Sequence, residues 1–86
     1  MKPNKIFQDL IDISEAIGVK IVQEKGNFKG GYCLLEQEKI IVINKLNPVE
    51  QRIRALAQAF SQWDTSKIYM KPAIREIIDY EAEHRQ

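Results

Sequence analysis

Apolar side chains recur at helical spacing near the start of the chain. Three and four residues separate most of them, so they gather on one face of a helix. Gly18 stands where a left-handed residue commonly ends a helix. The pattern predicts a helix over residues 4–17 with a buried stripe. The stripe consists of Ile6, Phe7, Leu10, Ile11, Ile13 and Ile17.

Three short segments then carry the patterns of β-strands. In residues 19–24 apolar and charged side chains alternate, with Val22 as the exception. Residues 31–36 place Tyr32 and Leu34 on one face of a strand and Cys33 and Leu35 on the other. Residues 39–44 contain four consecutive β-branched side chains, which is typical of a strand that is covered on both faces. Glycines and lysines in residues 25–30 predict a turn, as do Gln37 and Glu38.

Two further helices are predicted in the second half. Asn47 is a plausible N-cap, with Pro48 at the first helical position and Glu50 completing a capping box. Pro72 opens the last helix, and the polar tail from Glu81 to Gln86 is expected to fray. The sequence thus predicts one α+β domain over residues 1–86. We expect an N-terminal helix, a three-stranded, mostly antiparallel sheet, and two helices.

Composition and charge narrow the classes of function. The chain has 86 residues, 44% of them hydrophobic, which suits a small globular domain. Its 13 basic and 12 acidic residues provide no concentrated positive charge for nucleic acid or anionic membranes. Cys33 is the only cysteine, so an intramolecular disulfide is excluded. With no signal peptide or apolar span in the sequence, we expect a cytoplasmic protein without a membrane partner.

Several residue groups together resemble a known family. They are Gly31-x3-Leu35, Ile41-x-Ile43-Asn44 and Arg54-Ala55-Leu56-Ala57. Over residues 6–63, this order resembles the ImmA/IrrE-type zinc metallopeptidase-like domains, the minimal gluzincins. The resemblance implies a zincin-like core in which the helix after the third strand carries His-Glu-x-x-His. In that motif two histidines at i and i+4 hold zinc, and the glutamate activates water.

The motif itself is missing here. Its ligand positions hold Gln58 and Gln62, and its catalytic glutamate is replaced by Ala59. The resemblance therefore implies a degenerate member with no metal, no cofactor and no peptidase activity. A third ligand in such families comes from a later helix, where Glu76, Asp79 and Glu81 are available and nothing selects among them. Without the resemblance, the two glutamines are ordinary residues of a solvated helix face.

The leading functional prediction is a catalytically inactive, metallopeptidase-like domain that acts as a protein-interaction or regulatory module. A protein partner or a homodimer is expected, because large apolar residues cluster where the second helix meets the next connection. They are Trp63, Ile68, Tyr69 and Met70. Alternatively, these residues anchor the last helix on the core, and this is the favoured interpretation of the cluster itself.

Two alternatives remain open. A predicted hairpin over residues 25–32 carries Lys25, Phe28, Lys29 and Tyr32, which suit phosphate contact and base stacking in a nucleic-acid-binding module. Packing of the two aromatic rings on the sheet is the favoured interpretation there. The other alternative is a subunit of a peptidase whose site another chain completes.

Overall fold

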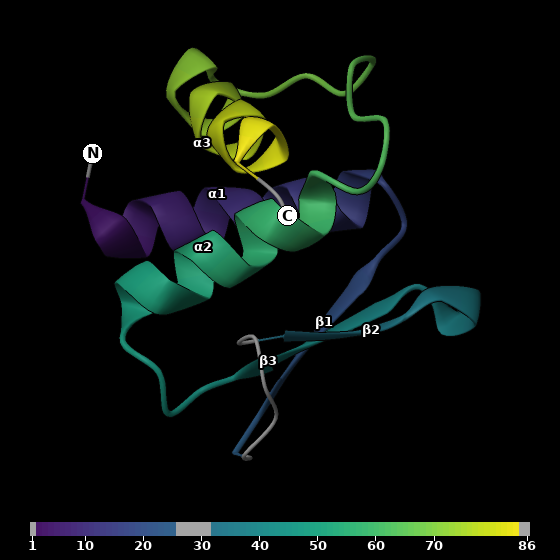
Figure 1. The fold of residues 1–86 in the computed structure, drawn as a ribbon, viewed down its shortest axis with the longest axis vertical. Helices are drawn as coiled ribbons and strands as arrows, with labels where there is room; N and C mark the ends of the chain where they lie inside the picture. The colour runs from purple at the N-terminus through teal and green to yellow at the C-terminus, as the bar shows by residue number, and fades with distance from the viewer. Residues whose placement is uncertain (1, 26–31, 85–86) are drawn as a thin grey trace.

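The computed structural model describes residues 2–25 and 32–84 of the chain. Figure 1 shows how the elements are arranged. In chain order they are α1 (Pro3–Ala16), β1 (Lys20–Glu24), β2 (Tyr32–Leu35), the 3₁₀ turn η2 (Glu36–Glu38), β3 (Ile40–Asn44), α2 (Val49–Phe60) and α3 (Pro72–Glu83). The predicted α+β class is confirmed, and every predicted element lies within a few residues of its expected place.

The strand pairing differs from the prediction. The strands lie in the order β1-β3-β2, with β1 parallel and β2 antiparallel to β3. The expectation of a mostly antiparallel sheet is therefore wrong. The hairpin predicted over residues 25–32 is also wrong, because β3 separates the two strands that it was expected to join. Alternation along a chain predicts that a segment is a strand, but not which strand becomes its neighbour.

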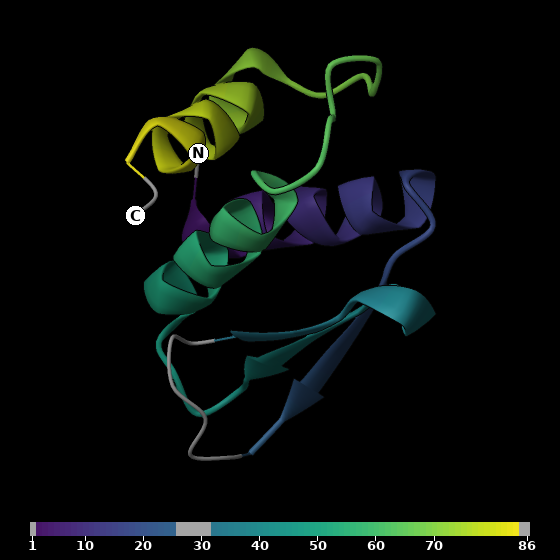
Figure 2. The same cartoon turned by 45° about the vertical axis from the view of Figure 1, so that its right-hand side comes forward.

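The helices form two layers on one side of the sheet. In Figures 1 and 2, α1 and α2 cross above the sheet, and α3 lies on the far side of them. The central element is α2, which contacts α1, α3, β3 and β2. Its alanines make this close packing feasible, because small side chains let neighbouring elements approach from several directions. Ala55, Ala57 and Ala59 are at most 3% exposed.

The core is built where the helices meet the sheet. Ile41 and Ile43 of β3 are fully buried, and Ile40 and Val42, on the opposite face, are half-buried. The expectation that both faces of this strand are covered is thus wrong, since the helices cover one face only (Figure 2). The largest fully buried apolar side chains are Leu10, Ile41, Ile43, Leu56, Phe60 and Ile74.

The ends of the helices can be compared with the capping signals predicted from the sequence. Gly18 follows α1 with φ of +77°, as the sequence predicts for its cap. At α2 the N-cap is Pro48 and no side chain caps the helix, so the capping box predicted at Asn47 is wrong. The Asn47 carbonyl instead accepts a hydrogen bond from Arg52 Nε at 3.1 Å. The predicted frayed tail is also wrong over 81–83, because α3 continues to Glu83 and Glu81 is 4% exposed.

No helix in the described parts of the chain combines the length and the apolar character that crossing a bilayer requires.

Candidate functional site

The three motif positions lie near the C-terminal end of α2 and differ sharply in exposure. Ala59 is fully buried in the core, whereas Gln58 is half-buried. Since α2 ends at Phe60, Gln62 lies in the turn after the helix, where its amide N–H donates to the Ala59 carbonyl at 3.2 Å. The position of the family's catalytic glutamate therefore belongs to the packed interior.

The three acidic candidates on α3 also separate. Glu76 and Asp79 are exposed, and Glu81 is buried. The Glu81 carboxylate accepts a hydrogen bond from Arg54 Nε at 3.2 Å, which ties α3 to α2. Arg54 itself is 70% exposed, so this ion pair lies at the border between core and solvent. Within residues 2–25 and 32–84, no three His, Cys, Asp or Glu side chains are grouped so that they could hold a metal ion.

The connection between α2 and α3 is held in place by one arginine. Arg75 Nη2 donates to the carbonyls of Thr65 at 3.1 Å and Ile68 at 2.7 Å, and its Nη1 reaches Thr65 Oγ1 at 3.5 Å. Thr65 is buried, so its carbonyl has little access to water. These contacts of Arg75 could not be predicted, because no local sequence pattern pairs an arginine on a helix with a carbonyl ten residues earlier.

A second local contact shapes the same connection. The Asp64 carboxylate accepts a hydrogen bond from the Ser66 amide N–H at 3.0 Å, which closes a short turn. Hydrogen bonds from the Ser66 side chain and backbone lower the pKa of Asp64 and outweigh a small opposing effect of desolvation.

The four predicted partner-binding residues do not lie together on the surface. Trp63 is partly buried and its ring lies 6.3 Å from that of Phe60, Ile68 packs partly buried against the core, and Met70 is 9% exposed. These three contacts agree with the interpretation that the connection anchors α3. Tyr69 differs, because it is 89% exposed.

A shallow groove lies beside Tyr69, between α1 and the start of α3. Its volume is about 180 Å³. The groove, called the Tyr69 groove below, is lined by Asp9, Asp12, Ile13, Ala16, Tyr69, Met70, Lys71 and Ile74. Apolar side chains thus meet an acidic rim. On that rim the Asp9 carboxylate contacts Lys5 Nζ at 3.2 Å and Lys71 Nζ at 3.3 Å, which joins α1 to the residue before α3.

The Asp9 ion pairs predict an acid-dependent loss of stability. Desolvation raises the pKa of Asp9, but the hydrogen bonds and charges of Lys5 and Lys71 together outweigh it and lower the pKa. A carboxyl whose folded-state pKa is lowered stabilises the fold above its unfolded value, about 4, and loses that contribution as pH falls through the folded value. We expect Asp9→Asn to lower the urea midpoint at pH 7 and to have little effect at pH 2.

The comparison at two pH values separates charge from packing. An equal loss at pH 7 and pH 2 would show that Asp9 acts through packing or hydrogen bonding alone. Asp12→Asn is the matched control, since Asp12 also lines the groove but forms none of the ion pairs found among the described residues.

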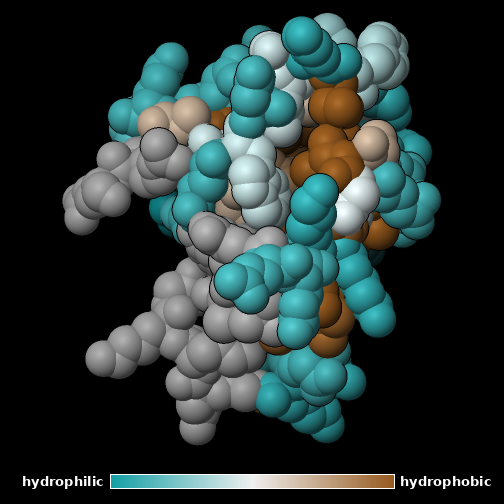
Figure 3. Space-filling view, turned by 90° about the vertical axis from the view of Figure 1, so that its right-hand side faces the viewer, coloured by the Kyte–Doolittle hydropathy of each residue, from teal (hydrophilic) through white to brown (hydrophobic). Residues whose placement is uncertain are grey.

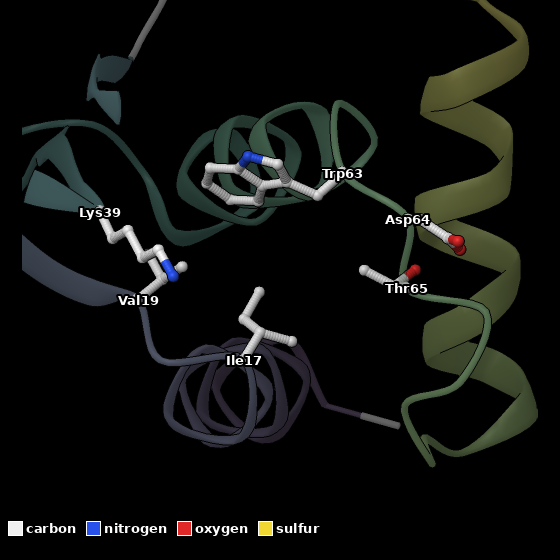
Figure 4. Close-up of a pocket in the computed structure, with 6 residues that line it drawn as sticks. All are labelled: Ile17, Val19, Lys39, Trp63, Asp64 and Thr65. Carbon is white, nitrogen blue, oxygen red and sulfur yellow. The ribbon is translucent and has the colours of Figure 1, made fainter. Parts of the chain in front are cut away.

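A larger cavity lies on another side of the molecule, where the end of α1, the start of β1 and the end of α2 meet. It has a volume of about 350 Å³ and is called the Trp63 cavity below. Its lining residues are Ile17, Val19, Lys39, Trp63, Asp64 and Thr65 (Figure 4). Figure 3 shows apolar side chains gathered in a strip on the side of the molecule that carries the α2–α3 connection. Trp63, predicted as a partner-binding residue, is therefore part of a concave site.

The predicted nucleic-acid contacts are only partly described. Lys25 is exposed directly after β1, and Tyr32 opens β2 opposite Ile43. Phe28 and Lys29 lie outside the described residues. Because β1 and β2 are the two edges of the sheet, Lys25 and Tyr32 belong to opposite edges and do not form the two arms of a hairpin.

A scan against protein-family models and searches of curated proteins and of solved structures each find no match.

Proposed function

We propose that this protein is a non-catalytic protein-interaction module built on a zincin-like core, and that the Tyr69 groove receives the partner. One observation carries the proposal: the connection 61–71 displays an almost fully exposed tyrosine from a backbone that Arg75 holds at two carbonyls. Tyrosine is enriched among the residues that dominate binding energy at interfaces.

The hydrogen bonds from Arg75 to the connection matter, because binding normally costs the conformational freedom of interface residues. A loop that is already fixed loses less freedom when a partner binds, so more of the contact energy appears as affinity. Three anchors fix the backbone on either side of Tyr69: Arg75 at Ile68, the buried Met70 side chain, and the ion pair between Lys71 and Asp9. Tyr69 is thus presented by a fixed backbone.

The motif positions support a non-catalytic role. Ala59 carries no group that accepts a proton, and its side chain is packed inside the core. The zincin-like architecture is part of the proposal, and its support is the resemblance of the β3–α2 segment described above. The α2 helix, where the family binds zinc, would serve here as the central packing element between the sheet and α3.

The test is capture of partners by tagged protein from the lysate of its own host, with and without nuclease treatment. Three baits are compared: the unchanged chain, Tyr69→Ser, and Leu46→Ser. Leu46 is a matched control because it is another exposed large apolar residue, 65% exposed, in a different part of the molecule. We expect one protein to be recovered by the first and third baits and lost with Tyr69→Ser, with no change in melting temperature beyond that of the control.

The same three variants also test whether the partner is a second copy of this chain. Sedimentation velocity of the purified chain would then show a dimer that Tyr69→Ser dissociates. The proposal is wrong if Tyr69→Ser retains both the recovered protein and any self-association. It is also wrong if every interaction disappears with nuclease, since the partner would then be nucleic acid.

A further inference from the structure

We propose that the Trp63 cavity binds a small organic anion with an aromatic or aliphatic body, of the arylalkyl carboxylate class. This site is separate from the Tyr69 groove, and the two share no lining residue. The inference therefore does not depend on the proposed function. The Trp63 cavity has a volume of about 350 Å³, which falls in the range of roughly 300–1,000 Å³ that is usual for small-molecule sites.

The lining of the cavity combines three apolar residues with three polar ones, which are Lys39, Asp64 and Thr65. Ile17, Val19 and the Trp63 indole provide the apolar part, and Figure 4 shows Ile17 and Trp63 on opposite sides of the space. Tryptophan offers a large rigid surface against which a ring or an alkyl chain can pack. Small-molecule sites usually combine apolar side chains with polar groups that orient the ligand, and this lining offers both.

The sign of the charge favours an anion. Lys39 takes part in none of the ion pairs among the described residues. Its ammonium lies at the rim of the cavity, beside Val19 in Figure 4. The other charged group, Asp64, points its carboxylate away from Trp63 and Lys39 in that view, and it is already used in the turn with Ser66. Lys39 is thus the charge that a ligand would meet.

The backbone at Lys39 provides an independent reason. Lys39 has φ of +54° and is the one described non-glycine residue with a positive φ. Glycine adopts this conformation without the steric cost of a Cβ atom, so a lysine there is less stable than a glycine would be. Backbone strain of this kind tends to occur at functional sites, where the side chain has a role that glycine cannot fill. A role of the Lys39 ammonium in ligand binding would explain why a lysine, and not a glycine, occupies this position.

The binding test uses three probes that differ only in their polar end: 4-phenylbutyrate, 4-phenylbutanol and 4-phenylbutylamine. Trp63 is the only tryptophan, so its fluorescence reports on this cavity directly. At low ionic strength, we expect the carboxylate to bind about fivefold more tightly than the alcohol, as for a partly exposed charge pair. The amine should bind more weakly than both. Added salt should reduce these differences, because it screens the charge.

Variants at Lys39 separate binding from stability. Lys39→Gly should raise the melting temperature, since it relieves the backbone strain, and should remove the preference for the carboxylate. Lys39→Arg should retain that preference, because it keeps the charge. Lys45→Ala is the control, as Lys45 is an exposed lysine that does not line the cavity.

The proposal is overturned if the three probes bind the unchanged chain equally, or if none of them alters the Trp63 emission. It is also overturned if the preference for the carboxylate persists in Lys39→Gly. The proposal is supported if Lys39→Gly raises the melting temperature and also removes the preference for the carboxylate. A lysine with a purely structural role would not change ligand selectivity.

Discussion

Replacing Ala59 with glutamate is expected to lower the free energy of unfolding by about 3–5 kcal/mol, as for an uncompensated buried charge. Ala59 is fully buried on a helix that is packed between the sheet and α3. A carboxylate there would either lose its hydration or displace the neighbouring elements. Urea unfolding followed by circular dichroism measures the loss. Ala73→Glu is the control, and a change within about 0.5 kcal/mol is expected because Ala73 is exposed.

This result bears on the peptidase alternative. A glutamate that activates water must reach an open site. If another chain completed a peptidase site around α2, we would therefore expect position 59 to tolerate a glutamate. Should Ala59→Glu be as stable as the control variant, α2 would open more easily than its packing indicates. The peptidase-subunit hypothesis would then deserve more weight than the interaction module.

The second large effect is expected at Arg75. Its Ala variant should lower the free energy of unfolding by about 2–3 kcal/mol, because hydrogen bonds from a charged donor to two carbonyls are lost. One of those carbonyls belongs to the buried Thr65, so water replaces the donor poorly. The variant should also weaken partner binding through Tyr69 beyond its effect on stability, since the connection loses its anchor at Ile68.

Two matched variants sharpen this prediction. Arg75→Lys keeps the charge but lacks the planar fork that bridges two acceptors, so we expect it to recover only part of the stability. Lys67→Ala, on the exposed surface of the same connection, should change stability by less than about 0.5 kcal/mol. If Arg75→Ala bound the partner as tightly as the unchanged chain, the fixed backbone would not be the source of affinity.

The elements themselves were predictable because their signals are local. Helical spacing of apolar residues, Gly18 after the first helix and Pro72 at the start of the last one lie within a few residues of the structure that they determine. Strand pairing was not predictable in this way. The parallel ladder between β1 and β3 joins residues twenty positions apart, and its stability comes from packing on α2 and α1 that no local pattern reports.

The candidate site shows the same division. Composition singled out residues 63–72 for their large apolar side chains, and Trp63, Ile68 and Met70 do pack against the core, whereas Tyr69 is exposed. Which of them is exposed depends on Arg75 and on the ion pair between Lys71 and Asp9, both contacts between distant residues. The sequence placed Glu81 in a frayed tail for a similar reason, since its ion-pair partner, Arg54, lies on another helix.

The central position of β3 in the sheet has a consequence for the order of folding. β1 is made before the other two strands on the ribosome, yet among the described strands it pairs with β3 alone. It therefore has no native strand partner until residues 40–44 have emerged, whereas β2 and β3 are joined by the short turn η2 and can pair as soon as both exist. A nascent chain that stops before Ile40 would carry two strands with no native neighbour, and pulse-labelled amide exchange should show β2 and β3 protected together before β1.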